Sequence, residues 1–355
     1  MNKEKKSHVF VAMSGGVDSS VAALLLKKQG YDVTGVYMKN WSDPLADQCV
    51  WKDDIADFKA VCKKIQIPGK IEIFEEQYRK KVVNYLINGY KDGITPNPDM
   101  LCNKEIKFQV FLEKAKKMGA DFIATGHYVQ KKVLKNSEYT LLQAIDKKKD
   151  QSYFLSLLTQ KQLHHSLFPL GRFKKQEVRK IAKKYRLPVY DKKDSQGICF
   201  IGKVKFSDFI KKFINIKPGL IKDEKNVVLG KHDGLPFFTI GQRHGINIAA
   251  KKPYYVCEKK FKTNILVVCN DSLKSKLYKN CAVIKKINWI NKTTHFPILC
   301  KARIRYRQPL QACKVNKSNN YYQLTFNKKQ RAITPGQFIV LYQGKRMLGG
   351  GAIIK

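Results

Sequence analysis

Ser14-Gly15-Gly16-Val17-Asp18-Ser19-Ser20 lies between a short apolar run at 8–13 and an expected helix at 21–29. Paired glycines let a backbone turn tightly and bring its N–H groups close to a polyanion. The helix that follows directs the positive end of its dipole at the same place. The serine hydroxyls supply further donors, and Asp18 is a candidate ligand for Mg²⁺. The stretch therefore predicts a phosphate-binding loop between a strand and a helix.

This loop is not a Walker loop, because the Gly-x-x-x-x-Gly-Lys-Ser/Thr pattern is missing. It resembles the loop of enzymes that split ATP into AMP and pyrophosphate in order to adenylate a substrate. The alternative is a helix cap that happens to be rich in serine and glycine. The complete heptapeptide between a strand and a helix disfavours that alternative.

Around the loop, the first part of the chain alternates between strand-like and helix-like segments. Strands are expected at 8–13, 32–38, 70–74 and 121–125, and helices at 21–29, 47–65, 76–90 and 103–118. Such alternation predicts parallel strands joined by crossover helices, which is an α/β sheet covered on both faces. Ligands bind beyond the carboxyl ends of such strands. The segments after Met13, Met38 and Thr125 are therefore expected to converge on one site.

Beyond residue 200 the segments become short, β-branched and separated by turns. Strands are expected at 254–257, 265–269, 301–307, 321–326 and 337–342, and turns at 344–345 and 349–351. This pattern predicts an all-β region with a small barrel at the C-terminus. The predicted domains are an ATP-binding catalytic α/β domain at 1–204, a small central linking domain at 205–280 and a β-barrel at 281–355.

The chain is strongly basic, with 69 lysines and arginines against 28 acidic residues and a net charge of +41. A basic surface suggests a nucleic-acid partner. The excess is almost all scattered lysine, which a drift in codon usage explains equally well. No apolar stretch approaches the ~20 residues of a membrane span, and the first residues lack the pattern of a signal peptide. A cytoplasmic protein without membrane contact is expected.

The nine cysteines are dispersed, and no Cys-x-x-Cys pair occurs. That spacing argues against a structural zinc site, an iron–sulfur cluster and a disulfide framework. Two cysteines have informative neighbours. Cys102 follows Asn97-Pro98-Asp99-Met100-Leu101, and Asn103 is a suitable N-cap for the next helix, so the helix dipole would favour a Cys102 thiolate. Asp99 is a candidate for proton transfer. A structural cysteine remains the alternative.

The second cysteine is Cys199, in Asp194-Ser195-Gln196-Gly197-Ile198-Cys199-Phe200-Ile201-Gly202. Its glycine neighbours and its place near a domain junction predict an accessible thiol that can reach both a donor and an active site.

These motifs, in this order, resemble the tRNA-specific 2-thiouridylase family over nearly the whole chain. The resemblance includes Ala-Thr-Gly-His-Tyr at 124–128, Asp-Gln-Ser-Tyr-Phe-Leu at 150–155, Arg-Tyr-Arg-Gln at 305–308, Pro-Gly-Gln at 335–337 and the final three glycines. Ala12 and Tyr37 depart from the glycine and phenylalanine common in the family. Neither departure removes a reacting group.

The resemblance implies ATP-dependent 2-thiolation of the wobble uridine, the reaction of a tRNA-uridine 2-sulfurtransferase. ATP would adenylate O2 of the base, and a persulfide on Cys199 would supply the sulfur. Cys102 would form a transient disulfide with Cys199 or otherwise release the sulfur, and Asp99 would act as acid or base. The implied partners are tRNA, especially lysine, glutamate and glutamine tRNAs, and a sulfur-relay protein or cysteine desulfurase as the persulfide donor.

The resemblance also implies two sets of binding residues. ATP, with Mg²⁺ on Asp18, would contact Ala12, Met13, Ser14, Gly15, Gly16, Val17, Asp18, Ser19, Met38 and Gly126. The tRNA would contact Asn97, Pro98, Asp99, His127, Lys149, Asp150, Gln151, Arg305, Tyr306 and Gln337.

A basic strand is expected at 301–307, where Lys301, Arg303, Arg305 and Arg307 alternate with uncharged residues. A period of two would place all four cations on one face, and arginine matches phosphate geometry. The alternative is a solvated face of a barrel strand.

Two other functions compete with this interpretation. Another adenylating ligase of the same loop class would need no pair of cysteines. A non-catalytic RNA-binding protein would not need an intact loop.

Overall fold

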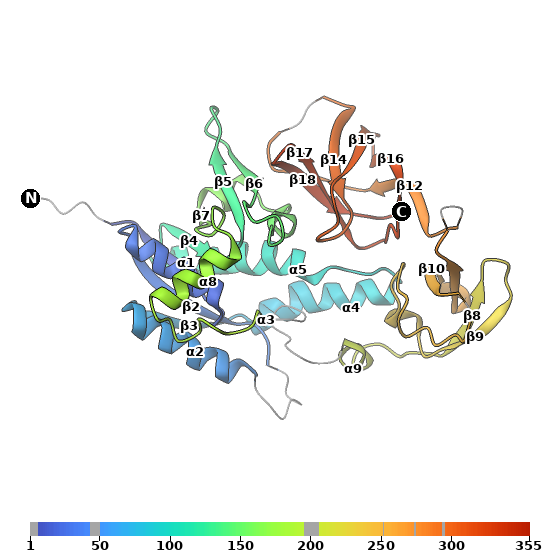
Figure 1. Ribbon diagram of the computed structural model, residues 1–355, viewed down its shortest axis with the longest axis horizontal. Helices are drawn as coiled ribbons and strands as arrows, with labels where there is room; N and C mark the ends of the chain where they lie inside the picture. Colours follow the sequence, from blue (N-terminus) through green and yellow to red (C-terminus); the bar gives the residue numbers. More distant parts are fainter. Residues whose placement is uncertain (1–5, 43–49, 195–205, 251, 273–274, 293–294) are drawn as a thin grey trace, which may run out of the picture.

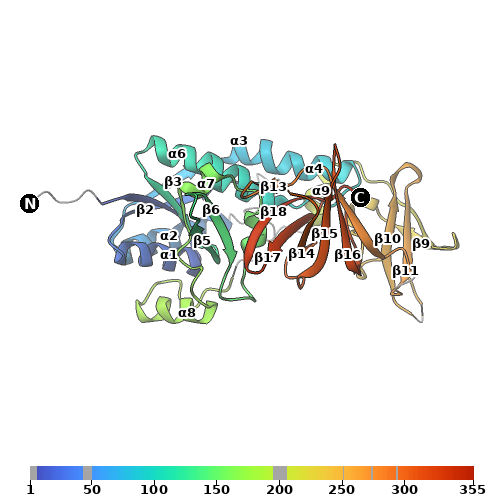
Figure 2. The same cartoon turned by 90° about the horizontal axis from the view of Figure 1, so that it is seen from above.

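The computed structural model describes residues 6–42, 50–194, 206–250, 252–272, 275–292 and 295–355. In Figure 1 the α/β part lies at one end, and the central and C-terminal β parts lie at the other. The helices α3 and α4 extend from the α/β part towards the β parts in both views (Figures 1 and 2).

The α/β part is built on a five-stranded sheet with the order β3-β2-β1-β4-β7. Its strands are β1 (His8–Ala12), β2 (Asp32–Lys39), β3 (Gly69–Ile73), β4 (Phe122–Thr125) and β7 (Ser166–Leu167). Every neighbouring pair is parallel. The expected parallel sheet is confirmed, and its central strand β1 is almost wholly apolar because helices cover both of its faces.

Alternate residues of β1 pack against different helices. Val9 and Val11 face α1 (Val17–Lys28), α2 (Val50–Ile65) and α8 (Lys175–Lys184). Phe10 and Ala12 face the opposite layer. That layer consists of α3 (Glu75–Tyr78), η1 (Arg79–Val83), α4 (Asn84–Lys91), α5 (Pro98–Leu101), η2 (Cys102–Val110) and α6 (Phe111–Lys117).

The helix expected at 103–118 begins earlier than predicted. Asn97 is its N-cap in an extended conformation, and Pro98 occupies the first turn. Proline suits this position because its missing N–H would have no partner inside the helix. Cys102 therefore lies inside the helix, and its expected place ahead of the helix is wrong. Asn103 is not a cap, since its side-chain amide donates to the carbonyl of Asp99 at 3.0 Å.

The β parts form two further sheets. The central sheet has the order β10-β11-β8-β9, with β8 (Gly219–Asp223), β9 (Val228–His232), β10 (Tyr254–Lys260) and β11 (Ile265–Asn270). The C-terminal sheet contains β12 (Tyr278–Ile284), β13 (Asn288–Trp289), β14 (Ile298–Arg303), β15 (Gln311–Lys317), β16 (Tyr322–Arg331), β17 (Phe338–Gln343) and β18 (Arg346–Ala352). It continues into β6 (Tyr139–Gln143) and β5 (Val129–Val133) of the α/β part. The remaining described helices are η3 (Ser152–Leu155), α7 (Gln160–His164), α9 (Phe206–Lys211), η4 (Leu235–Phe237) and η5 (Phe261–Thr263).

Two features of the C-terminal region differ from expectation. The glycines at 349–351 lie within β18 rather than in a turn. Close neighbours leave no room for a side chain at these positions. A Cβ on Gly350, for example, would lie 2.7 Å from the Ser156 hydroxyl and 2.8 Å from the Ile339 carbonyl oxygen. The expected turn at 344–345 is confirmed as the connection between β17 and β18.

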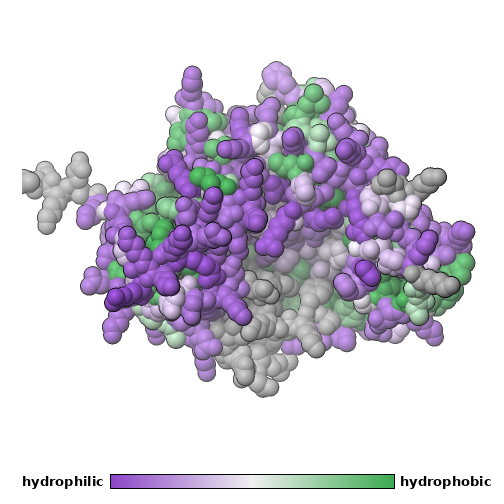
Figure 3. Space-filling model, viewed as in Figure 1, coloured by the Kyte–Doolittle hydropathy of each residue, from purple (hydrophilic) through white to green (hydrophobic). Residues whose placement is uncertain are grey.

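The C-terminal sheet is also joined to the segment that leads into α5. The Thr95 backbone N–H donates to the Pro335 carbonyl at 2.9 Å, and the Gln337 amide donates to the Thr95 carbonyl at 2.9 Å. Hydrophilic residues cover most of the face shown in Figure 3. Within the described ranges, no helix combines the length and the apolar character needed to cross a bilayer.

Candidate active site

The glycine loop closes tightly onto the first turn of α1. Gly15 has a φ of +70°, and a Cβ there would come within 3.1 Å of the Asp54 Cα, so only glycine fits without strain. Gly16 is the N-cap of α1. The Ser14 N–H donates to the Ser19 hydroxyl at 3.2 Å, and the Ser20 hydroxyl donates to the Gly16 carbonyl at 2.8 Å. The loop is thus held in one conformation at the start of a helix.

Three neighbouring strand ends meet at this loop. Ala12, at the end of β1, pairs with Val36 of β2 and Thr125 of β4. Gly126 follows β4, and a Cβ there would lie 2.8 Å from the Ser19 backbone nitrogen. The expected convergence of these segments is confirmed by the sheet order. Their contact with ATP stays a prediction.

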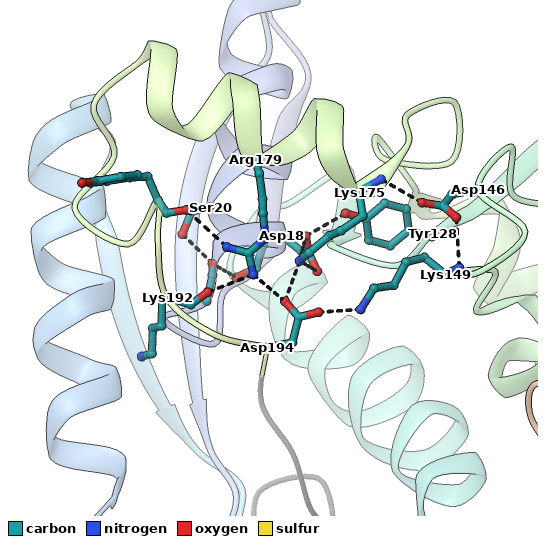
Figure 4. A network of polar contacts seen from close by, with 12 residues as sticks. Asp18, Ser20, Tyr128, Asp146, Lys149, Lys175, Arg179, Lys192 and Asp194 are labelled. Atoms are coloured by element: carbon teal, nitrogen blue, oxygen red, sulfur yellow. Dashed lines mark hydrogen bonds and ion pairs between the residues drawn. The ribbon is translucent and has the colours of Figure 1, made fainter.

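Asp18 already has a cationic partner. The Lys175 ammonium donates to both of its carboxylate oxygens at 2.7 and 2.8 Å, and the Tyr128 hydroxyl donates to one of them at 2.8 Å (Figure 4). Burial and the nearby Asp18 charge raise the pKa of Tyr128. The carboxylate suits Mg²⁺ by its chemistry, but the Lys175 ammonium must move before a metal ion can take both oxygens.

Asp194 is surrounded by three cations. Lys149 lies 2.5 Å from its carboxylate, Lys175 lies 2.7 Å away and Arg179 lies 3.3 Å away (Figure 4). Burial opposes ionisation, but the hydrogen bonds from Lys149 and Lys175 lower the pKa of Asp194 to about 2. Because Lys175 also pairs with Asp18, three cations are shared between two carboxylates beside the glycine loop.

Sequence reasoning missed Lys175 and Arg179. Their spacing of four residues on α8 places them on one helical face, but that spacing alone does not say which carboxylates they meet. Asp194 is the last described residue before position 206. Cys199, and with it the implied Cys102–Cys199 disulfide, lies outside the described residues.

Lys192 ties the glycine loop to α2. Its ammonium donates to the Gly15 carbonyl at 3.2 Å and forms ion pairs with Asp54 at 2.8 Å and Asp57 at 2.6 Å. Burial opposes the charge, but the two carboxylates outweigh it and raise the pKa of Lys192. The ammonium thus stays charged next to the loop.

Cys102 is deeply buried, with 1% of its surface exposed. It belongs to the core cluster between the parallel sheet and the layer from α3 to α6, and that cluster also contains Ala12 and Met38. Asp99 precedes it by three residues in one continuous helix, and this spacing puts both side chains on the same face. This spacing is compatible with the expected pairing of the Cys102 thiol with the Asp99 carboxylate, which stays a prediction, whereas the expected position of Cys102 at the start of the helix is wrong.

His127 is buried just after the carboxyl end of β4. Its Nδ1 lies 2.7 Å from the Thr125 hydroxyl, and burial, together with the positive charge of Lys107, lowers its pKa well below the usual range. The ring is therefore neutral near neutral pH. Gln151 pairs with Tyr128, accepting from its N–H at 3.0 Å and donating its own N–H to the Tyr128 carbonyl at 2.9 Å.

Asp150 has intramolecular partners on every side. It is 2% exposed and accepts from the Gln143 amide at 3.0 Å and from the N–H groups of Ala144 and Ser152, both at 3.2 Å. The guanidinium of Arg303 lies 3.5 Å away. This buried ion pair joins the loop between β6 and η3, which contains Asp150, to β14.

The prediction of a basic strand at 301–307 is wrong for its second half. β14 ends at Arg303, and the chain then turns, with Arg307 at a φ of +65°. Arg303 is 7% exposed and its guanidinium carbon lies 5.0 Å from the Tyr342 ring centroid, whereas Lys301, Arg305 and Arg307 are exposed. The four cations do not share one face, because strand alternation requires extended backbone throughout.

Tyr306 lies in this turn and packs on aromatic neighbours. Its ring centroid is 4.5 Å from that of Phe154 and 6.0 Å from that of Tyr153. Burial raises the pKa of Tyr306. The Arg307 guanidinium lies 5.3 Å from the same ring, and Arg305 donates to the Arg331 carbonyl at 3.3 Å. The turn thus presents two arginines beside a fixed aromatic ring.

Three family models match successive parts of the chain. Residues 7–203 match the tRNA methyl transferase HUP domain, residues 207–270 match the tRNA methyl transferase PRC-barrel domain, and residues 279–353 match the aminomethyltransferase beta-barrel domain.

The chain is also similar to curated proteins along its full length. A tRNA-specific 2-thiouridylase MnmA of Pseudomonas fluorescens (strain Pf0-1) is 46% identical over 98% of this chain and 95% of the relative. The protein of the same name from Shouchella clausii (strain KSM-K16) is 46% identical over 100% of this chain and 98% of the relative. The one from Francisella tularensis subsp. novicida (strain U112) is 45% identical over 98% and 99%.

Proposed function

This chain belongs to the tRNA-specific 2-thiouridylase family, and we propose that it uses ATP and a cysteine persulfide to convert the wobble uridine of tRNA to 2-thiouridine. The observation that carries this proposal is identity of 46% along the full chain, combined with the glycine loop at the meeting point of three parallel strand ends. The three-part α/β and β architecture agrees with the matched domains.

ATP binds at the glycine loop in this proposal, with its base and sugar towards Met38 and Gly126 and its phosphates on the N–H groups of 14–19. Lys175 and Arg179 then exchange the Asp194 carboxylate for phosphate oxygens, because a polyphosphate offers more negative charge than one carboxylate. Departure of Lys175 leaves Asp18 able to bind Mg²⁺.

The chemistry that follows balances without an added oxidant. Uridine O2 attacks the α-phosphorus of ATP, and pyrophosphate leaves. The terminal sulfur of a Cys199 persulfide attacks C2, and AMP leaves. The Cys102 thiolate then attacks the Cys199 sulfur, which breaks one S–S bond, forms the Cys102–Cys199 disulfide and releases 2-thiouridine. An external thiol reduces the disulfide, and Asp99 moves protons beside Cys102.

The tRNA contacts proposed from the resemblance divide into two groups by exposure. Lys149, Arg305 and Tyr306 have accessible surface that can meet RNA directly. Asp150 and Gln337 form contacts within the protein. We therefore propose that Asp150 positions the loop between β6 and η3 and that Gln337 positions the segment that precedes Asn97.

Some finer points rest on the resemblance alone. They are the lysine, glutamate and glutamine tRNAs and the sulfur-relay protein or desulfurase. The domain division at 1–204, 205–280 and 281–355 is also a prediction, and its second boundary falls within β12 (Tyr278–Ile284).

The reaction is tested with α-labelled ATP, unmodified tRNA and a persulfide donor. The expected products are AMP, pyrophosphate and 2-thiouridine in the digested tRNA. The Asp18→Asn variant should fold normally, as judged by its circular dichroism, and release no pyrophosphate. Release of ADP and phosphate would exclude the proposed activation step, and AMP release without any thiolated nucleoside would favour another adenylating ligase.

A further inference from the structure

Two buried cysteines and one carboxylate meet at one end of the central sheet. The sulfur atoms of Cys257 and Cys269 and a carboxylate oxygen of Glu224 all lie within 4.8 Å of one another. The cysteines are 4% and 2% exposed, whereas Glu224 is exposed. In the part of the chain that the structure describes, this is the one group of three such side chains with that spacing. We propose that these three side chains bind zinc(II), with water as the fourth ligand.

Strand register brings the three ligands together. β10 and β11 are antiparallel with Tyr255 opposite Cys269, and an irregularity between Val256 and Glu258 makes Cys257 the extra residue. Both thiols then lie on the sheet face that packs against Leu277. The two cysteines come from separate strands and the carboxylate from a turn, so no Cys-x-x-Cys motif marks this site in the sequence.

The third ligand, Glu224, lies in the turn that follows β8, on the other side of β11. β8 runs parallel to β11 with Asp223 beside Val268, so Glu224 comes next to Cys269. The carboxylate is held there by the Lys276 backbone N–H, which donates to it at 2.9 Å. An outer partner of this kind orients a metal ligand.

Zinc binding would change the protonation of both thiols. The Cys257 thiol donates to the Val267 carbonyl at 3.5 Å. Because the thiolate is the metal ligand, zinc binding releases thiol protons and strengthens as pH rises.

The ligand set selects the cation. Thiolates favour zinc over magnesium or calcium, and a tetrahedral zinc site accepts two sulfurs, one carboxylate oxygen and water. An ion here would tie the turn after β8 to β10 and β11. Its effect would be to stabilise the central sheet where it meets the C-terminal sheet, away from the glycine loop.

The chain contains a matched control. Cys300 and Cys313 face each other directly across β14 and β15, with their sulfur atoms 3.7 Å apart. No third ligand completes that pair within the described ranges. If two adjacent thiols were enough for zinc, both pairs would bind it. If the carboxylate is needed, only the Glu224 site would.

The experiment is a competitive titration of reduced, metal-free, full-length protein with Zn²⁺ against a chromophoric chelator. The Cys300→Ser/Cys313→Ser variant should bind as the wild type does. Cys269→Ser should lose one equivalent. Glu224→Gln changes only an exposed side chain, so the fold is retained, and it should weaken this equivalent by at least about tenfold. Cobalt(II) should give a thiolate charge-transfer band that Cys269→Ser lacks.

Thermal unfolding provides a readout that does not depend on activity. Zinc should raise the midpoint of the wild type and of the Cys300→Ser/Cys313→Ser variant, because a ligand of the native state stabilises it. Equal zinc uptake by the wild type and Cys269→Ser would overturn the proposal. Full retention of affinity in Glu224→Gln would also overturn it.

Discussion

Lys175 connects two carboxylates from distant parts of the chain, with its ammonium 2.7 Å from Asp18 and 2.7 Å from Asp194. Asp18 lies in the first turn of α1, and Asp194 lies in the segment after α8. One cation thus joins the glycine loop to the residue that precedes the undescribed segment 195–205. Any anion that binds at the loop must compete with these two carboxylates for Lys175.

This competition predicts opposite effects of two substitutions on ATP affinity. Lys175→Met should weaken ATP binding by about 10- to 100-fold, since a charge-assisted hydrogen bond is lost. Asp194→Asn should strengthen binding, because the cations no longer have to leave a charged partner. Equilibrium binding of a non-hydrolysable ATP analogue measures both, with the exposed Lys180→Met on the same helix as the control. Equal affinities in all variants would contradict the proposed phosphate site.

The two cysteines should fail at different steps. Cys199→Ser should still consume ATP to adenylate tRNA but retain no sulfur from a donor. Cys102→Ser should load sulfur on Cys199 and then stop before the disulfide forms. Cys62→Ser is the control, because Cys62 is also a buried cysteine of the α/β part. Intact-mass and peptide mapping after a single turnover distinguish these outcomes, and full activity of Cys199→Ser would refute the assignment.

The buried pair of Arg303 and Asp150 should matter for stability. Arg303→Met leaves the Asp150 carboxylate without its cation, at a cost of about 3 kcal/mol. The double variant with Asp150→Asn should regain part of that loss, since no unpaired charge is then buried. Thermal unfolding midpoints measure the effect. Arg305→Met, at an exposed site, should change the midpoint little.

The exposed arginines of the turn should matter for tRNA instead. Arg305→Ala and Arg307→Ala should each weaken tRNA binding by about 1–3 kcal/mol if they contact phosphates. The salt dependence of binding should fall by about one unit of slope per lost contact. Filter binding over a range of salt concentrations tests this. Unchanged tRNA affinity in both variants would show that this turn is a solvated surface without a role in tRNA binding.

Lys259 should make stability depend on pH. Burial lowers its pKa to about 8 in the folded state, against about 10.4 when unfolded. Between these values the unfolded chain binds more protons, so stability rises with pH. The advantage of Lys259→Met over the wild type should therefore shrink by up to about 3 kcal/mol from pH 7 to pH 10.5. The exposed neighbour Lys260→Met should show no such trend in unfolding midpoints.

The sequence was sufficient for the parallel sheet and the glycine loop. Apolar runs such as 8–13 and the paired glycines report local backbone preferences and burial, and here the tertiary structure agrees with them. It was not sufficient for the basic strand or for the glycines at 349–351. Arg303 is buried in an ion pair with Asp150, and position 350 requires glycine because Ser156 lies too close for a Cβ. Neither partner can be identified from residues nearby in the chain.

By itself, then, the sequence determined the family, the α/β class and the loop where phosphates are expected, because each depends on residues that are contiguous or regularly spaced. Only the tertiary structure decided which charges meet. Lys175 reaches Asp18 across 157 positions, and Cys257 meets Cys269 and Glu224 through strand register. The physical reason is that the chemistry of a charged group or a thiol depends on the groups that lie next to it in space, and the order and register of the strands determine which groups those are.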